Sequence, residues 1–111
     1  MERKRVYISG QIRGKEDYMI HFSNAKRYLL STGVFTGVVN PAEVGYVLPM
    51  DFVHEEYMTV SLAILSMCDA IYMLDGWQNS EGAKEEYAMA KAKGIDIIYE
   101  NDTDRIMSGD C

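Results

Sequence analysis

Basic residues are scarce in this chain, because 11 Lys and Arg stand against 17 Asp and Glu and leave a formal net charge of -6 over 111 residues. Binding to a nucleic-acid backbone needs a basic surplus that displaces counterions. The charge balance therefore excludes polymeric nucleic acid as a partner, although a small charged metabolite is compatible with it. Long apolar runs are also missing. None approaches the ~20 residues that cross a bilayer, so we expect no membrane association.

Cysteine is nearly absent, since the chain has only Cys68 and Cys111, without CxxC spacing and without clustered histidines. This excludes a structural zinc site and favours a reducing compartment. Two glycine-rich motifs are missing as well: the GxGxxG of dinucleotide-binding folds and the GKS/T ending of a P-loop. We therefore expect a cytoplasmic protein that uses no metal and no cofactor, and the sequence disfavours an NAD-dependent oxidoreductase.

What the chain does contain is a regular alternation of short β-rich runs and longer helical patterns. The β-rich runs are Arg5–Ser9, Phe35–Asn40, Asp69–Leu74 and Ile95–Glu100, and the helical patterns are Lys15–Ser31, Asp51–Met67 and Ser80–Lys93. Because parallel neighbours need a crossover helix, the alternation predicts an α/β fold. We expect a Rossmann-like (flavodoxin-like) three-layer sandwich whose parallel sheet has about four strands in the order 2-1-3-4. Residues 1–100 would form one domain, followed by a polar tail over residues 101–111.

This strand order predicts where a ligand binds, because the chain reverses direction between the first and third strands and opens a crevice at their carboxyl ends. The loops beside that crevice are Gly10–Gly14 and Asp75–Ser80. The glycines of the first loop allow tight turns, and Arg13 adds a planar cation suited to phosphate or carboxylate. The competing interpretation is a plain turn with a solvated arginine, and Tyr7 is most simply a core aromatic.

The last helical pattern, "SEGAKEEYAMAKAKG", carries three glutamates that are not equivalent. At 100° per residue Ala83, Glu86 and Ala90 share one face, whereas Glu81 and Glu85 lie away from it. Glu86 therefore faces inward, and Gly82, one turn earlier, would leave space above its carboxylate. The alternative is a glutamate at the edge of the helix that reaches water or a cation, because an unpartnered buried carboxylate is costly.

Three further residues of the predicted crevice have two interpretations each. Ser80 is either the N-cap of its helix or a donor to a ligand anion. Trp77 is a lid or stacking platform for a ligand, or else a hydrophobic plug on its loop. Asn40 opens the segment Asn40–Pro49, whose Pro and Gly residues are typical of a functional loop, and it is a candidate substrate-binding residue.

Three segments in this order, "VYISGQIRG", "CDAIYML" and "SEGAKEE", resemble those of the nucleoside deoxyribosyltransferase superfamily. The chain resembles especially the deoxynucleoside monophosphate N-glycosidases and small bacterial and phage relatives, from Arg5 to about Glu100. The resemblance implies that Glu86 attacks the anomeric carbon of a deoxyribose and releases the base. Water or a second base then resolves the covalent glycosyl-enzyme, as in a retaining glycosidase.

The resemblance also implies roles for the residues around Glu86. Tyr7 would contact the sugar or orient the nucleophile, and Ser80 and Gly82 would bind the phosphate or the 5-hydroxyl. Gln11 stands where the glycosidases often have serine, which would weaken or redirect phosphate contacts. The residues that would frame the base and the phosphate are Gly10, Ile12 and Arg13.

One position departs from the family. Ser61 stands where the family usually has an aspartate that helps to protonate or orient the leaving base, and serine is not a comparable acid. The base could leave unassisted, or another residue of the same helix could supply the acid. The candidates are Asp51, His54, Glu55 and Glu56.

The same departure motivates a second hypothesis, a catalytically weak module that binds or senses a nucleotide. For an active enzyme, hydrolase and transferase share the covalent half-reaction and are not separated by the sequence. The resemblance further implies a homodimer or a higher homo-oligomer. Apolar residues of the second helical pattern that could serve as its interface, although part of the set is core, are Phe52, Tyr57, Met58, Leu62 and Leu65.

Overall fold

The fold is built on one sheet of four parallel strands, β1 (Arg5–Ser9), β2 (Gly37–Val39), β3 (Ala70–Met73) and β4 (Asp96–Tyr99). The structure is a computed structural model that describes residues 4–45 and 47–102. The strand order β2-β1-β3-β4 confirms the predicted topology. The two inner strands are buried at nearly every position, as strands covered on both faces should be. Of the predicted polar tail, residues 103–111, with Cys111, lie outside the described residues.

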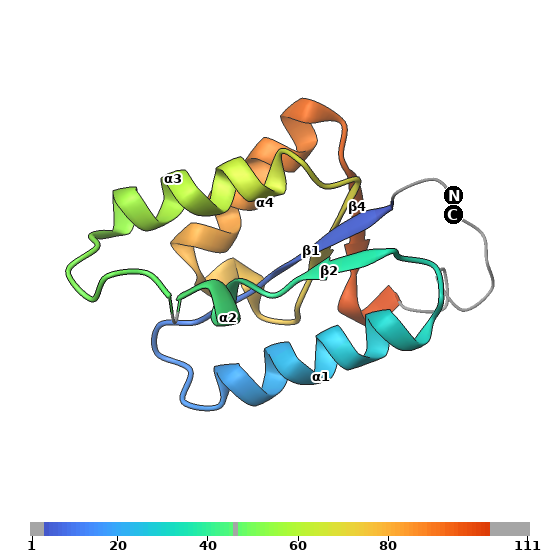
Figure 1. Cartoon of the computed structure of the whole chain (residues 1–111), viewed down its shortest axis with the longest axis horizontal. Coiled ribbons are helices and arrows are strands. Elements are labelled where there is room, and N and C mark those ends of the chain that lie inside the picture. The colour runs from blue at the N-terminus through green and yellow to red at the C-terminus, as the bar shows by residue number, and fades with distance from the viewer. Residues whose placement is uncertain (1–3, 46, 103–111) are drawn as a thin grey trace.

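Helices cover both faces of this sheet, so the molecule has three layers (Figure 1). Helices α3 (His54–Leu65) and α4 (Glu81–Lys93) lie on one face and α1 (Tyr18–Ser31) on the other, near the short α2 (Pro41–Gly45). Helix α1 begins three residues later than predicted, because Tyr18 closes a turn onto the carbonyl of Lys15. Helix α3 begins at His54 instead of Asp51. Short 3-10 turns follow β3 and β4, at Trp77–Asn79 and Glu100–Asp102.

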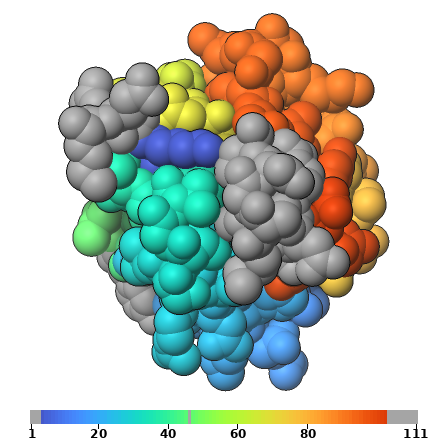
Figure 2. All heavy atoms as spheres, turned by 90° about the vertical axis from the view of Figure 1, so that its right-hand side faces the viewer, coloured from blue at the N-terminus to red at the C-terminus, as the bar shows by residue number. Residues whose placement is uncertain are grey.

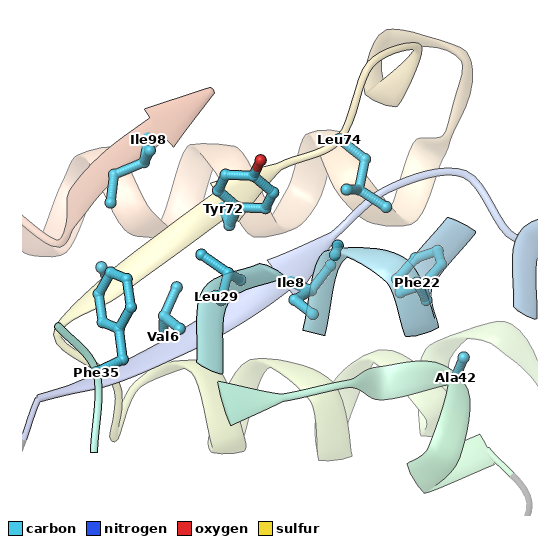
Figure 3. Packing of buried hydrophobic residues seen from close by; sticks show 11 residues of the cluster. Val6, Ile8, Phe22, Leu29, Phe35, Ala42, Tyr72, Leu74 and Ile98 are labelled. Carbon is cyan, nitrogen blue, oxygen red and sulfur yellow. The ribbon is translucent and has the colours of Figure 1, made fainter. Parts of the chain in front are cut away.

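The alternation of side chains along β1 divides the interior into two clusters. Val6 and Ile8 point toward α1, where they pack with Phe22 and Leu29 (Figure 3). Tyr7 belongs to the other cluster, which lies under α3 and α4 and contains Leu65 and Ala90. Successive residues of a strand face opposite sides of the sheet, so β1 alone contributes to both clusters.

Asp69 has the structural role that is common for an aspartate at the start of a strand. Its carboxylate accepts a hydrogen bond from the backbone N–H of Arg5 at 2.8 Å, and its own N–H donates to the Arg5 carbonyl at 2.8 Å. Figure 2 shows this end of the molecule, where the start of β1 (blue) lies between the segments that precede β2 and β3. The contact fixes the central strands at the end remote from the predicted crevice.

One absence and one interface expectation concern the surface. Within residues 4–45 and 47–102, no helix has the length and apolar character needed to span a bilayer. Among the apolar residues expected to form an interface on α3, Met58 and Leu65 are buried in the core of the chain itself. The structure thus assigns these two side chains to the packing of α3 rather than to its surface.

Candidate functional site

The ends of β1 and β3 are joined closely at the predicted crevice. Leu74 donates its backbone N–H to the carbonyl of Ser9 at 2.8 Å. A Cβ atom on Gly10 would lie 2.8 Å from Cδ1 of Leu74, so only glycine permits this approach. Gly14, with φ of +77°, takes the left-handed conformation that its turn requires. The glycines of the first loop therefore have backbone reasons for their positions.

Helix α4 presents Glu86 to the sheet, as its sequence predicts. The buried residues of α4 are Ala83, Glu86 and Ala90, and the two alanines are at most 1% exposed, so the helix lies close to the strands. Glu81 and Glu85 are exposed and pair with Lys84 and His54. Glu86 is therefore the glutamate of this helix that the fold removes from water.

The carboxylate of Glu86 is held by hydroxyl groups. The Tyr7 hydroxyl donates to Oε2 at 2.5 Å, and the Ser9 hydroxyl donates to Oε1 at 2.6 Å. Ser61 of α3 lies close enough to Tyr7 for its hydroxyl to lower the pKa of the Tyr7 hydroxyl, so α3 adjoins the same group of residues. Only 6% of Glu86 is exposed, and it forms no ion pair with any described residue. Each carboxylate oxygen of Glu86 thus has one hydroxyl donor, and none of the described residues provides a cationic partner for its charge.

This environment changes the acidity of both partners. Burial raises the pKa of Glu86 from 4.5 to about 7, against the hydrogen bonds from Ser9 and Tyr7 that lower it, and the nearby charge of Glu85 raises it further. Burial and the charge of Glu86 raise the pKa of Tyr7 far above its ordinary value, although the nearby Ser61 hydroxyl lowers it. Tyr7 therefore keeps its proton, while Glu86 changes charge near neutral pH. A carboxylate of this kind can act as a nucleophile or as a base.

Two residues of this site were missed by the sequence analysis. Ser9 shares the face of β1 with Tyr7, so a polar residue two positions after Tyr7 in an apolar strand was the available signal. The other is Tyr57 of α3, because burial and then, as the second largest cause, the nearby charge of Glu86 raise the pKa of its hydroxyl. That hydroxyl donates to the carbonyl of Pro41 at 3.1 Å. No sequence pattern distinguished Tyr57 from the apolar residues of its helix.

The described hydrogen bonds and ion pairs of Glu86 include none to the residues predicted in the first loop. Ile12 packs against the apolar cluster on the α1 face. The Gln11 side chain donates to the carbonyl of Arg13 at 3.0 Å, which holds the loop. Arg13 is exposed and forms no ion pair with any described residue. Its guanidinium is thus available to an anion from solution.

Two predicted residues have clear packing or capping contacts. Ser80 is the N-cap of α4, because its hydroxyl accepts from the N–H of Ala83 at 3.1 Å. Trp77 stacks on Tyr87, with ring centroids 4.6 Å apart and planes at 24°, and packs against the apolar cluster under α3 and α4.

Asn40 and Gly82 also have structural explanations. The Asn40 side chain is buried and accepts from the N–H of Ala42 at 3.0 Å, so it initiates α2 inside a segment that was predicted as a loop. The space expected beside Gly82 is filled, because a Cβ there would lie 3.2 Å from the sulfur of Met58 and 3.8 Å from the His54 ring. Gly82 therefore allows α3 to approach α4 closely.

The four residues considered as substitutes for the missing acid are not hydrogen-bonded to Glu86. Glu56 accepts from the N–H of Val53 at 3.1 Å and caps α3, and His54 pairs with Glu85 at 2.9 Å. Asp51 and Glu55 are exposed. Within residues 4–45 and 47–102, no group of three or more His, Cys, Asp or Glu is placed to hold a metal ion.

The fold and the site together define a parallel α/β protein with a buried, hydroxyl-bound carboxylate beside the carboxyl ends of its central strands. The chain belongs to the family DUF4406, a domain of unknown function, whose model matches residues 4–99. The match covers all four strands and the helices between them, with Tyr7, Ser9 and Glu86 inside it. A comparison with curated proteins gives no match.

Proposed function

We propose that this protein cleaves or transfers the N-glycosidic bond of a deoxynucleoside or a deoxynucleoside 5-monophosphate, with Glu86 as the nucleophile. One observation carries the proposal: the Glu86 carboxylate is buried at the predicted crevice, with a hydroxyl donor on each oxygen. A purely structural buried glutamate would be expected to pair with a cation, and none of the described residues provides one. The resemblance to deoxyribosyltransferases supports the same assignment.

The proposed reaction is a double displacement. A Glu86 oxygen forms a bond to the anomeric carbon while the bond from that carbon to the base nitrogen breaks, and the electron pair leaves with the base, which takes a proton from water. Water, which loses a proton, then attacks the same carbon and frees Glu86. A second base in place of water would give transfer. Burial strengthens the interaction of the carboxylate with the positive charge that develops on the sugar.

Base release is the direct test. The protein is incubated with each of the common deoxynucleosides and their 5-monophosphates, and the free base is quantified by chromatography. Replacement Glu86→Gln keeps the shape of the side chain but removes the nucleophile, so the rate should fall at least about 10³-fold. The matched control is Glu85→Gln, which changes the neighbouring exposed carboxylate and should keep most of the activity. Equal rates for Glu86→Gln and wild type would remove Glu86 from the mechanism.

An excess of a different free base distinguishes transfer from hydrolysis. A transferase forms the new nucleoside, whereas a hydrolase releases deoxyribose or its phosphate at an unchanged rate. Both products are separated in the same chromatogram. Either outcome keeps Glu86 as the nucleophile and decides which acceptor reaches the covalent intermediate.

A second candidate function is the binding or sensing of a nucleotide without efficient turnover. The observation that favours it is Ser61, a buried serine close to Tyr7 at the position where the similar enzymes have an acid for the leaving base. Tight nucleotide binding measured by calorimetry, without base release from any of the four deoxynucleotides, would support it. Hydrolysis that depends on Glu86 would exclude it.

A further inference from the structure

The two oxygens of Glu86 are bound differently. Oε2 accepts from Tyr7, a rigid aromatic side chain whose hydroxyl lies close enough to Ser61 for Ser61 to lower its pKa. Oε1 accepts from Ser9, which is the last residue of β1 and is 0% exposed. The donor to Oε2 therefore has a second hydroxyl close to it, while Ser9 is the hydroxyl donor that Oε1 has among the described residues.

The charged groups around Glu86 give its anion no support. On α4 the charge of Glu85 raises the pKa of Glu86, and the Glu85 carboxylate is itself paired with His54 of α3. Among the described residues, the other titratable groups whose pKa the charge of Glu86 raises are Tyr7 on β1 and Tyr57 on α3, and burial helps to keep both protonated. Hydrogen bonds to an ionised acceptor are about twice as strong as neutral ones, so the loss of either donor should raise the pKa of Glu86.

We propose that Ser9 is a positioning residue for Glu86, because its hydroxyl fixes the orientation of the carboxylate and stabilises the charged form that attacks the sugar. The inference rests on the proposed function only where it concerns attack on the sugar. Its effect on the ionisation of Glu86 requires no turnover. With Glu86 only 6% exposed, solvent is poorly placed to replace the lost donor.

The ionisation of Glu86 is measured first, by NMR titration of the side-chain carboxyl carbons, with the Glu86 signal identified by its loss in Glu86→Gln. Because a hydrogen bond to the charged form lowers a pKa, Ser9→Ala should raise the pKa of Glu86 by about one unit, a tenfold change in its acid dissociation constant. Ser9→Thr retains the hydroxyl and should restore the wild-type titration. The control is Val6→Ala, a truncation on the other face of the same strand, which should leave the titration unchanged.

The kinetic measurement uses the same variants. For Ser9→Ala the acid limb of the kcat/KM profile should move up by about one pH unit, so that the rate is about tenfold lower near pH 6 and approaches wild type above about pH 9. A purely structural defect would lower the rate equally at all pH values. If Ser9→Ala leaves the Glu86 titration within about 0.3 unit of wild type, the role of Ser9 is excluded.

The failure of this inference differs from the failure of the proposed function. A shifted Glu86 titration in Ser9→Ala without base release from any substrate removes the enzymatic function and keeps Ser9 as the residue that stabilises the carboxylate. Base release that depends on Glu86, together with an unchanged titration and pH profile in Ser9→Ala, keeps the enzyme and overturns the inference. Ser9→Cys, which preserves the volume, replaces Ser9→Ala if the alanine variant does not fold.

Discussion

Helices cover both faces of the sheet, but the residues buried beneath them differ between the two faces. On the α1 face, β1 and β3 contribute Val6, Ile8 and Tyr72 to a cluster of apolar and aromatic side chains (Figure 3). On the face of α3 and α4, the alternate residues of β1 are Tyr7 and Ser9, and both hold the buried carboxylate of α4. One strand therefore supplies packing to one side and polar contacts to the other.

The difference between the faces has an energetic meaning. Apolar burial stabilises the fold at about 25 cal/mol per Å², whereas a buried carboxylate without a cation destabilises it. The hydroxyl donors of Glu86 offset only part of the cost of burying its charge, since the pKa of Glu86 remains raised to about 7. Both faces thus contain an apolar cluster that stabilises the fold, but the face of α3 and α4 also holds a buried charge that costs stability, a cost that the proposed function would explain. Each of the following variants tests this difference between the faces.

The largest effect is expected on the apolar face. Leu29 is 0% exposed in the α1 cluster, so Leu29→Ala should lower the free energy of unfolding by about 2 to 5 kcal/mol through lost burial and the cavity left behind. Denaturant unfolding measures the loss. The control, Leu30→Ala on the exposed side of the same helix, should change stability by less than about 0.5 kcal/mol. A shift in the Glu86 titration of the Leu29 variant would show that the two faces are not independent.

The next variant, Glu86→Gln, should increase the stability of the fold instead of lowering it. Because the pKa of Glu86 in the folded state is raised to about 7 from 4.5, the folded protein binds the proton more tightly than the unfolded chain. The contribution of Glu86 to stability is fully present below about pH 4.5 and is lost as the pH rises through about 7. Glu86→Gln cannot ionise, so its stability relative to wild type should increase by about 3 kcal/mol over this range.

This prediction is checked by denaturant unfolding of both proteins at about pH 4.5 and about pH 8, where the difference between the two curves isolates Glu86 from the other titrating groups. Glu85→Gln serves as the control, because that exposed residue lacks the burial that creates the slope. If wild type and Glu86→Gln follow the same pH dependence, Glu86 is not a destabilising anion and the contrast between the faces disappears.

A smaller effect is expected from Tyr7→Phe, which removes the donor to Oε2 and the hydroxyl close to Ser61. The pKa of Glu86 should rise, and stability at about pH 8 should fall by about 1 to 3 kcal/mol, because Glu86 stays buried without that donor. NMR titration and denaturant unfolding measure the two quantities. Tyr72→Phe is matched in chemistry but lies on the α1 face, so it should not move the Glu86 titration. Equal titration shifts in the two variants would contradict the assignment.

Much of the fold could be predicted because it depends on local patterns. The β-rich runs, the helical spacing and the rule of right-handed crossovers were sufficient for the strand order β2-β1-β3-β4. The period of α4 was sufficient to place Glu86 inward between Ala83 and Ala90. The alternation of elements and the helical period each repeat along many residues, so a single residue that departs from the pattern does not obscure it.

The contacts of the site depend instead on which residues meet across elements, and local patterns in a single sequence do not encode this. Ser9 was missed because its partner lies 77 positions away. Gly82 was assigned a space that Met58 of another helix occupies. Asn40 was placed in a loop because the short α2, which it caps, has too few residues to show a helical period.

The smallest effect on stability should come from Arg13→Ala. This variant tests whether substrate recognition extends beyond the residues around Glu86. The side chain is exposed and unpaired among the described residues, so unfolding should change by less than about 0.5 kcal/mol. If its guanidinium binds a 5-phosphate, KM for a deoxynucleoside monophosphate should rise about tenfold or more, while KM for the matching deoxynucleoside stays constant. Arg27→Ala, an exposed arginine of α1, controls for net charge. An equal rise for both substrates would instead place Arg13 at the base or the sugar, and no rise for either would exclude it from the site and restrict recognition to the residues around Glu86.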